Sequence, residues 1–385
     1  MKPLTPLKYY AANKKKASLV IVILILAACI VSFTTSLIMS IIIDATKANL
    51  DPFKNISIVR PGVGDVYLKD SAVEKIDGFE DVDRTYGMWL EFSYMKTIVG
   101  QTSAPIIFPD DMTELNSMLK ACKLKLKEGR LPEGGEEYEI LLHERILMNK
   151  GLKVGDYMGQ DVKEDLNELL GKYKIVGTVE GDAFISFANH SKNKESLLDA
   201  GVEFVNPAGL LLVPKEGRLT QMNESLEDFS NKEAQFFSLA SMQRLIDEQI
   251  GAFQAVMLIL VIVTVFIISV SVSALIYIIY NNRNEEFGIL CAMGYRKAFI
   301  SRLVFKELAC LAFVSWAIGY FCSAGLFGLV NTLLLNPSGQ HLYFFTPIGL
   351  INTLIIPVMV IICATVPMLR KLKKWDPIAV IERRE

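Results

Sequence analysis

Long runs of apolar residues dominate the pattern of this sequence. Four stretches, residues 17–43, 251–281, 308–335 and 344–369, contain no Asp, Glu, Lys or Arg. A bilayer core about 30 Å thick requires roughly 20 consecutive, mostly apolar residues in a helix that crosses it. The pattern therefore predicts four transmembrane helices. The last contains Pro347, Pro357 and Pro367, which membrane helices tolerate when neighbouring helices pack against the break.

The first stretch could also be read as a cleaved signal peptide. It is longer than the roughly 7–15 apolar residues of a signal peptide, and no small-residue cleavage pattern follows it. It is therefore predicted to stay in the membrane as the first span.

Basic residues flank the four stretches unevenly. They are concentrated in the tail 1–16, the connection 282–307 and the tail 370–385, and the loop 336–343 has none. Lys and Arg near the ends of membrane spans favour the cytoplasmic side. We therefore expect both tails and the connection 282–307 in the cytoplasm, and residues 44–250 and 336–343 outside it. The formal net charge of −2 hides this asymmetry.

Residues 44–250 mix apolar with polar and charged residues, as a soluble domain does. β-Branched runs predict strands at 172–180 and 209–214, and amphipathic patterns predict helices at 139–150, 219–229 and 239–249. The last helix is expected to continue into the second span as a stalk. Cys122 is the one cysteine of this segment, so no disulfide can form within it. The expected fold is an all-α, four-helix transmembrane domain plus an α+β extracytoplasmic domain between spans 1 and 2.

The sequence carries no catalytic signature. The phosphate-loop pattern G-x-x-x-x-G-K-(S/T) and the metalloprotease pattern H-E-x-x-H are both missing. The histidines, His143, His190 and His341, lie far apart and lack metal-ligand spacing, which favours surface or capping roles. We therefore expect a non-catalytic membrane protein with no catalytic residue, no metal site and no cofactor of its own, and no nucleic-acid partner.

The connection 281–307 has the most informative local pattern. Ile289, Leu290 and Met293 form one apolar cluster, and residues 299–304 contain a second. Gly294 separates the two and is a natural helix break. The pattern predicts a short helix, a bend, and a helix that leads into the third span. From the residues alone, the short helix could lie on the lipid surface or dock into a groove of a soluble partner.

Residues 286–294 (EFGILCAMG) resemble the motif E-(I/F)-G-(I/L)-L-(R/K)-A-(M/L)-G of the FtsX/MacB-type permeases. These are membrane subunits of the mechanotransmission (type VII) ABC systems. Residues 128–132, 151–156 and 174–178 resemble the MacB-like periplasmic core domain, and Glu307, Gly319 and residues 376–378 fall where the family often has a Glu, a Gly and a terminal Asp-Pro. One departure is Cys291, where the family commonly has a basic residue.

The resemblance implies the partners of the chain. Family members dimerise, with a second copy or a paralogue, and bind two copies of a separate ABC ATPase that holds ATP and magnesium. It also implies a bacterial cytoplasmic membrane and substrates handled outside it, such as peptides, lipopeptides, lipoproteins or toxic amphiphiles, with efflux as one outcome and an extracytoplasmic adaptor or hydrolase as a further partner. The resemblance places ATPase coupling on Glu285, Glu286, Phe287, Gly288, Ile289, Leu290, Ala292, Met293, Gly294 and Tyr295.

Small residues at four-residue spacing mark close-packing faces on two spans. They are Ser269 and Ser273 in the second span, and Gly319, Ser323, Ala324 and Gly328 in the third. Contact between two copies and packing within one chain both explain such spacing, and the sequence leaves the two open.

Two other functions remain open. An FtsX-like regulator would switch a cell-wall hydrolase rather than export a substrate. A membrane receptor without an ATPase would tolerate polar or bulky substitutions at Gly288 and Met293.

Overall fold

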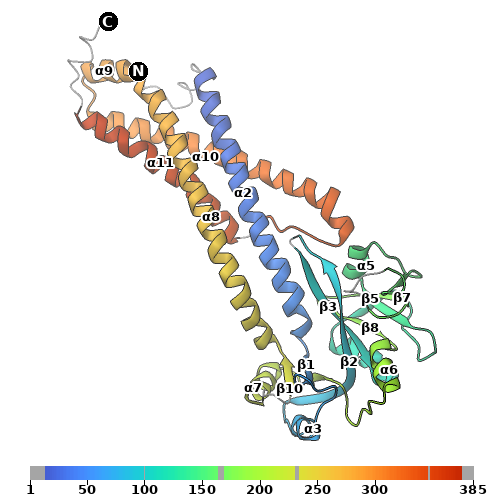
Figure 1. Ribbon diagram of the computed structural model, residues 1–385. Coiled ribbons are helices and arrows are strands. Elements are labelled where there is room, and N and C mark those ends of the chain that lie inside the picture. Colours follow the sequence, from blue (N-terminus) through green and yellow to red (C-terminus); the bar gives the residue numbers. More distant parts are fainter. Residues whose placement is uncertain (1–13, 99, 164–168, 230–233, 346, 375–385) are drawn as a thin grey trace. The chain divides into compact units, whose positions relative to one another are not determined.

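The computed structural model describes residues 14–98, 100–163, 169–229, 234–345 and 347–374 (Figure 1). The described residues divide into two compact units. A helical unit contains those within Met1–Ser40, Phe253–Val330 and Leu342–Glu385. An α/β unit contains those within Ile41–Ala252 and Asn331–His341.

The helical unit confirms the predicted spans. In the part of the chain that the structure describes, four helices are long and apolar enough to cross a membrane. They are α2 (Lys14–Leu50), α8 (Leu239–Asn281), α10 (Lys297–Val330) and α11 (Pro347–Lys374). The short helix α9 (Asn284–Ala292) lies between α8 and α10. Helix α10 begins at Lys297, before the predicted start of the third span at residue 308, so it includes Lys297, Arg302, Lys306 and Glu307 of the connection.

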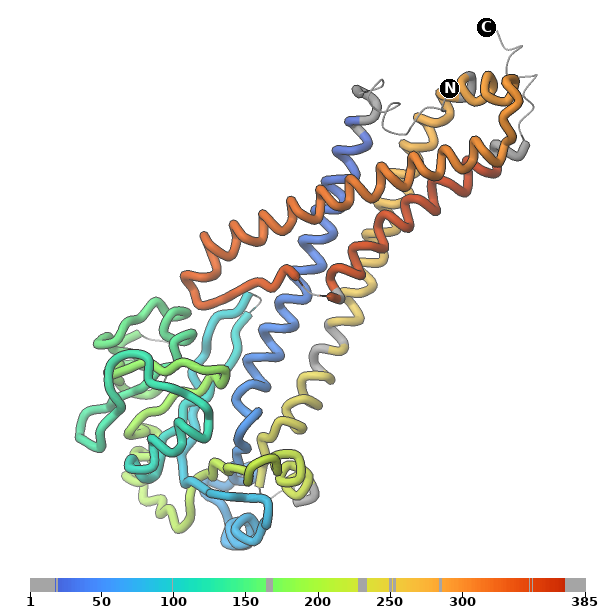
Figure 2. The backbone as a smooth tube through the Cα atoms, turned by 180° about the vertical axis from the view of Figure 1, so that it is seen from behind, coloured from blue at the N-terminus to red at the C-terminus, as the bar shows by residue number. Residues whose placement is uncertain are grey.

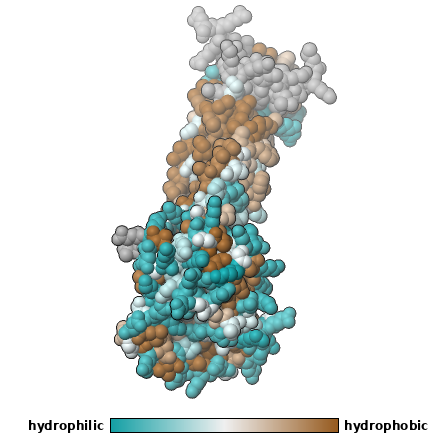
Figure 3. Space-filling view, turned by 90° about the vertical axis from the view of Figure 1, so that its right-hand side faces the viewer, coloured by the Kyte–Doolittle hydropathy of each residue, from teal (hydrophilic) through white to brown (hydrophobic). Residues whose placement is uncertain are grey.

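These helices share one apolar core and leave much apolar surface uncovered. Leu24 of α2, Val272 of α8 and Val360 of α11 are buried in the same cluster. Only 17% of the 18 most apolar residues in a row of α8 are buried, against 44% of those of α2. Figure 3 shows brown apolar side chains over the visible face of this unit, whereas the α/β unit is mostly teal. An apolar surface of this extent suits a bilayer rather than water.

The α/β unit is built on one mixed sheet. Ten strands form it among the described residues, in the order β10-β1-β9-β2-β3-β8-β5-β7-β4, with β6 paired to β7. Their bounds are β1 Ser57–Pro61, β2 Val82–Lys96, β3 Gln101–Pro109, β4 Lys125–Gly129, β5 Glu139–His143, β6 Tyr157–Met158, β7 Tyr173–Glu180, β8 Ser186–Ala188, β9 Leu210–Pro214 and β10 Ala234–Phe237.

The long strand β2 joins the two halves of this sheet. Its first part pairs with β9, where Tyr86 faces Leu211, and its second part pairs with β3, where Leu90 faces Ile107. The pairs β3–β8 and β5–β7 are parallel, and the other ladders are antiparallel. Because neighbouring parallel strands need a crossover connection, helices lie between such strands along the chain.

Helices cover the sheet through three apolar cores. Helices α3 (Asp70–Asp77) and α7 (Leu219–Phe229) pack on β1 and β9, burying Ile76 and Leu226. Helix α4 (Leu115–Ala121), preceded by the turn η2 (Met112–Glu114), buries Met118. Helix α5 (Glu144–Lys150) buries Ile146 near β5 and β7. Helix α6 (Lys192–Asp199) follows β8. The predicted α+β domain between spans 1 and 2 is confirmed.

Most of the local predictions for this unit are confirmed. Strands β7 and β9 and helix α7 lie at the predicted positions, and the predicted helix 239–249 continues without a break as α8. The predicted helix 139–150 is wrong in its first half, where β5 forms and all five residues are buried. A short continuous apolar run fits a buried strand as well as a buried helix. The second half is helical and ends, as expected, at Gly151, which has a φ of 67°.

The segment that joins α10 to α11 packs with the α/β unit. It contains η3 (Asn331–Leu335) and η4 (Asn336–Ser338), and a further short turn, η1 (Asp51–Phe53), follows α2. The Gln340 side chain donates to the backbone oxygen of Lys96 at 2.7 Å. Figure 2 shows this orange-red segment beside the tip of β2 and β3. This hydrogen bond fixes the loop to the sheet.

Candidate functional site

Helix α9 is set between two defined turns. Asn281 ends α8, and α9 begins at Asn284. At its other end, the Gly294 amide donates to the Cys291 oxygen at 3.0 Å and the Tyr295 amide donates to the Leu290 oxygen at 3.1 Å. These two bonds, with Gly294 at a φ of 87°, form a Schellman C-cap. The predicted break at Gly294 therefore has a specific geometry.

The inner face of α9 is fixed by an aromatic stack. Phe287 is 1% exposed and lies nearly parallel to the Tyr280 ring of α8, with centroids 6.5 Å apart. The Arg283 guanidinium carbon lies 5.2 Å from the Tyr280 centroid and 5.1 Å from the Phe287 centroid. Gly288 is also buried. Cation–π contacts of this kind are strongest where water is excluded, so the stack holds α9 against the helical unit.

A buried ion pair adds to this anchor. Arg283 Nη1 lies 2.7 Å from Glu307 Oε2, and the two side chains are 6% and 0% exposed. Tyr280 donates its hydroxyl to the same carboxylate oxygen at 3.0 Å. Arg283 Nε donates to Glu286 Oε2 at 3.0 Å. The network therefore connects α8, α9 and α10. We call Arg283, Glu307 and Tyr280 the inner lock.

The outer face of α9 presents two apolar side chains. Ile289 is 57% exposed and Met293 is 61% exposed, one helical turn apart. Leu290 packs instead against the core of the helical unit. The expected single stripe of Ile289, Leu290 and Met293 is therefore wrong, because Leu290 belongs to the inner face. Exposed apolar side chains on a polar connection are typical of a docking surface.

The remaining coupling residues lie at the ends of α9. Ala292 and Gly294 are exposed, and Glu286 is half-exposed while bound to Arg283. Tyr295 stacks on Phe299 with centroids 5.0 Å apart. The side chain of Glu285 and residues 376–378 lie outside the part of the chain that the structure describes. In the second apolar cluster, Ile300 and Val304 are buried in the core, so that cluster packs within the chain.

The small residues of α8 and α10 mostly face other helices of the same chain. A Cβ on Gly319 would lie 2.6 Å from the Ile25 oxygen and 2.8 Å from Ala28 Cβ, so α2 and α10 cross closely there. Ser269 and Ser323 are fully buried, and Ser273 Oγ donates to the Val360 oxygen at 3.4 Å. Ala324 is half-buried, and Gly328 lies at the surface. Contact with a second copy stays a prediction.

The comparison with known families concerns the C-terminal part of the chain. Residues 257–377, which include α9 and the three residues of the inner lock, match the family model "FtsX-like permease C-terminal". The C-terminal part of the chain is therefore an FtsX-like permease domain. No curated protein compared with the chain matches it.

The α/β unit is similar to two solved structures. One is the periplasmic region of MacB from Actinobacillus actinomycetemcomitans, with 11% identity, a TM-score of 0.29, and coverage of 51% of this chain and 94% of that one. The other is the extracellular domain of the ABC-type transporter YknZ from Gram-positive bacteria, with 8% identity, a TM-score of 0.26, and coverage of 47% and 98%.

The α/β unit contains an arginine–carboxylate pair that joins three of its segments and that the sequence did not indicate. Arg145 Nη2 lies 2.9 Å from Asp44 Oδ1, and the side chains are 20% and 4% exposed. Arg145 Nε donates to the Gly339 oxygen at 3.2 Å, and the guanidinium lies 4.3 Å from the Phe184 centroid. We call Arg145, Asp44 and Gly339 the outer clasp. It joins the end of α2, helix α5 and the loop before α11.

Gly339 is required where the loop meets α5. It has a φ of 65°, and a Cβ there would lie 2.8 Å from the Arg145 oxygen. Beside it, Asn149 Nδ2 donates to the Ser338 oxygen at 3.1 Å. His143 caps α5 by accepting a bond from the Arg145 amide at 3.2 Å, and its Nε2 lies 3.0 Å from the Gly181 oxygen. Burial lowers the pKa of His143.

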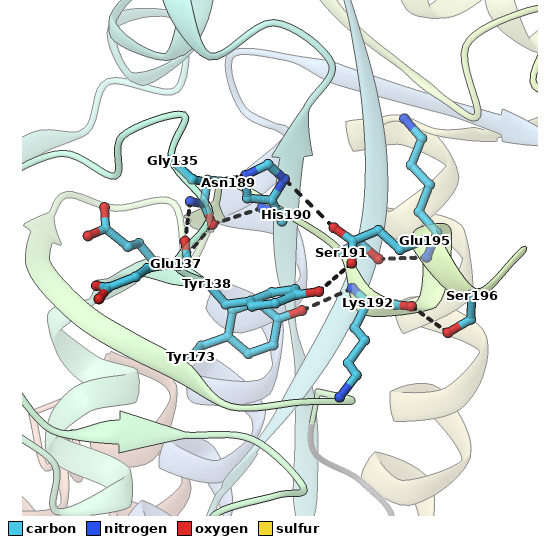
Figure 4. Close-up of polar contacts among 12 residues, drawn as sticks. Gly135, Glu137, Tyr138, Tyr173, Asn189, His190, Ser191, Lys192, Glu195 and Ser196 are labelled. Atoms are coloured by element: carbon cyan, nitrogen blue, oxygen red, sulfur yellow. Dashed lines mark hydrogen bonds and ion pairs between the residues drawn. The ribbon is translucent and has the colours of Figure 1, made fainter. Parts of the chain in front are cut away.

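A polar cluster near α6 has the side chains of a reactive site, but these side chains make hydrogen bonds that hold the local structure (Figure 4). Asn189 Nδ2 donates to the backbone oxygens of Glu133 and Glu137 at 2.8 and 2.7 Å. His190 Nε2 lies 2.7 Å from the Gly135 oxygen. Tyr138 donates to Glu195, and this bond raises the pKa of Tyr138 to about 12. The cluster ties the 133–138 loop down. Among the described residues, no group of three His, Cys, Asp or Glu is placed to hold a metal.

Proposed function

We propose that this chain is the permease subunit of an ABC transporter whose ATPase is a separate chain. The single observation that supports this is the division of α9 into an anchored inner face and an exposed apolar outer face. Phe287 and the inner lock fix the helix, and Ile289 and Met293 remain outside. A helix that transmits force needs both features, since a loosely held helix would move without moving the spans.

The proposed cycle begins in the cytoplasm. Two copies of the ATPase bind ATP and magnesium, close on each other, and draw together the α9 helices of two permease copies. The inner lock makes each α9 move with α8 and α10. Helix α8 runs unbroken from Leu239 to Asn281, so its motion reaches residues of the extracytoplasmic α/β unit. Both tails and α9 lie in the cytoplasm in this proposal, as the basic residues indicate.

The proposed substrates are peptides, lipopeptides, lipoproteins or toxic amphiphiles handled outside the membrane. A regulator of a cell-wall hydrolase would use the same cytoplasmic coupling. ATP-dependent release of an amphiphile from membranes that contain the complex favours export, whereas ATP-dependent activation of an added hydrolase favours regulation.

Co-purification with the ABC ATPase encoded nearest to this gene tests the proposal. Met293→Glu and, separately, Ile289→Glu place a charge on the outer face of α9 without touching the inner lock. We expect each to reduce ATPase recovery at least tenfold. The matched control is Leu198→Glu, which changes an exposed apolar residue of α6 and should leave recovery unchanged.

Recovery of the ATPase by both α9 variants at the wild-type level would contradict the proposed docking face. Monodisperse elution of each variant from a sizing column shows that loss of recovery does not reflect misfolding. If the wild-type chain retains no ATPase, the ABC-permease function itself is contradicted.

A further inference from the structure

A cavity of about 350 Å³ opens in the α/β unit beside the turn that follows β1. Its wall comes from the end of β1, the residues 62–66, and parts of β2, α6 and β10. Six lining residues matter for its chemistry: Arg60, Val63, Asp65, Trp89, Leu197 and Gln235. A cavity of this size, with a few polar groups among apolar ones, is the usual form of a small-ligand site.

Arg60 is a half-buried cation that has no carboxylate partner among the described residues. The other arginines of the unit either pair with a carboxylate, as do Arg130, Arg145, Arg218 and Arg244, or are exposed, as is Arg84. The Arg60 guanidinium carbon lies 5.8 Å from the Phe92 centroid. Burial lowers the pKa of Arg60. A cation that is partly removed from water without a counter-charge favours an anionic ligand.

Gln235 adds a neutral polar group beside this cation. It lies directly opposite Arg60 in the β1–β10 ladder, and side chains of opposed residues lie on the same face of a sheet. Its amide supplies both a donor and an acceptor. Asp65, the acid of the wall, pairs with Lys69 at 3.3 Å. The polar part of the cavity therefore combines one guanidinium with one side-chain amide.

The turn after β1 holds an apolar side chain beside these polar groups. The Asp65 amide donates to the Gly62 oxygen at 3.1 Å, and Gly64 has a φ of 95°, as in a type II turn. Val63, at the first central position of this turn, is 91% exposed. Trp89 lines the same cavity, and its Nε1 donates to Glu91 Oε1 at 2.8 Å, which fixes the ring. A ligand for this cavity therefore needs an apolar group next to its anion.

We propose that this cavity binds the C-terminal residue of a peptide, with its carboxylate on Arg60 and an apolar side chain against Val63 and Trp89. The planar guanidinium can donate two parallel hydrogen bonds to a carboxylate, and the Gln235 amide can bond to the last peptide group. A plain acyl chain would leave Gln235 without a hydrogen-bond partner in the ligand, which is unfavourable. The role of the cavity in recognising a transported peptide rests on the proposed export function, whereas the binding itself does not.

The test uses the full chain in phosphatidylcholine nanodiscs, titrated with acetyl-Gly-Gly-Leu and followed by saturation-transfer NMR. We expect saturable binding of the free acid, and at least tenfold weaker binding of the same peptide with an amidated C terminus. Arg60→Gln should weaken binding of the free acid at least tenfold, and Arg60→Lys by less, since lysine keeps the charge but lacks the planar fork. The control Arg84→Gln makes the same charge change at an exposed arginine of β2 and should bind as the wild type does.

A second variant tests the apolar contact. Val63→Ser should weaken binding of acetyl-Gly-Gly-Leu several-fold and leave that of acetyl-Gly-Gly-Gly unchanged. Equal binding of the acid and the amide by the wild-type chain would overturn the proposal, and so would equal binding of the acid by Arg60→Gln and the wild type. The first comparison needs no variant and therefore does not depend on whether Arg60→Gln folds.

Octanoate separates a peptide from a fatty acid as the ligand. Arg60-dependent binding of octanoate as tight as that of the peptide would contradict the assignment to a peptide. Because no ATPase takes part, failure here leaves the proposed docking of α9 untouched, and loss of ATPase recovery leaves this binding untouched.

Discussion

The inner lock and the outer clasp each join separate segments through an arginine–carboxylate pair, but the two pairs differ in burial. In each, an arginine pairs with a buried carboxylate and also lies over an aromatic ring. The Arg283–Glu307 pair is almost completely removed from solvent, and its partners are side chains. The Arg145 side chain remains 20% exposed, and one of its partners is a backbone oxygen of a loop.

This difference indicates which junction is rigid. Removing one member of a buried pair strands the other charge, which is costly, whereas a partly exposed arginine recovers some hydration when its partner is lost. The inner lock therefore makes α9 part of the helical unit. The outer clasp can open at lower cost, which suits a junction that changes in the proposed cycle.

The largest expected effect comes from breaking the inner lock. Glu307→Gln removes the buried carboxylate and leaves Arg283 with the half-exposed Glu286 as its charged partner among the described side chains, and we expect a loss of up to about 3–5 kcal/mol in the free energy of unfolding. Chemical denaturation of the chain in detergent measures it. ATPase recovery should fall as well, because α9 loses its anchor.

A double variant sharpens this prediction. Arg283→Met/Glu307→Leu removes both charges, and most of the lost stability should return, since replacing a buried pair by apolar groups is often close to neutral. If the double variant is no more stable than Glu307→Gln, the pairing of these two charges does not explain the effect.

Breaking the outer clasp should have a smaller and more local effect. Asp44→Asn keeps the shape of the side chain but removes the charge facing Arg145, and we expect a loss of about 1–3 kcal/mol, between the values for exposed and buried pairs. Hydrogen exchange should rise in residues 331–341 and remain unchanged in α9. Equal increases in both segments would show that the two junctions are not independent.

The smallest effect concerns the pH dependence of the His143 cap of α5, next to the outer clasp. Burial lowers the pKa of His143, so the folded chain resists a proton that the unfolded chain accepts below about pH 6.5. Stability contributed by neutral His143 is therefore present above that pH and is lost as the pH falls toward the lowered value. Protonation also removes the Nδ1 acceptor for the Arg145 amide at the start of α5.

Thermal unfolding of the full chain between pH 7.5 and pH 5 tests this (conditions chosen around the ordinary histidine pKa). His143→Asn keeps a capping acceptor that does not titrate, so it should flatten the acid limb of the profile. An unchanged acid limb in this variant would assign the pH dependence to other groups.

The sequence predicts the elements with strong patterns. The spans stand out because a charge-free apolar run long enough to cross a bilayer is rare outside membrane helices, and Gly294 marks the end of α9 because its backbone requires a positive φ. The run 139–143 misleads because both faces of β5 are covered, so the alternation that identifies a strand is lost.

The outer clasp and the two faces of α9 are harder to predict, because they depend on how distant parts of the chain pack. Asp44, Arg145 and Gly339 are far apart along the chain, and each alone is unremarkable. Their contact depends on where α5 and the loop before α11 pack. The division of Ile289, Leu290 and Met293 between two faces likewise depends on the direction in which α9 leaves α8, and apolar spacing alone does not determine that direction.

The spacing between Phe287 and Ile289 has a geometric consequence for α9. An α-helix turns by about 100° per residue, so the side of the helix on which Ile289 and Met293 point is set by the number of residues that separate them from Phe287. One residue inserted between Phe287 and Ile289 would rotate both exposed side chains by more than a quarter turn relative to the anchored face. The rotational phase of the contact surface is therefore encoded in this spacing.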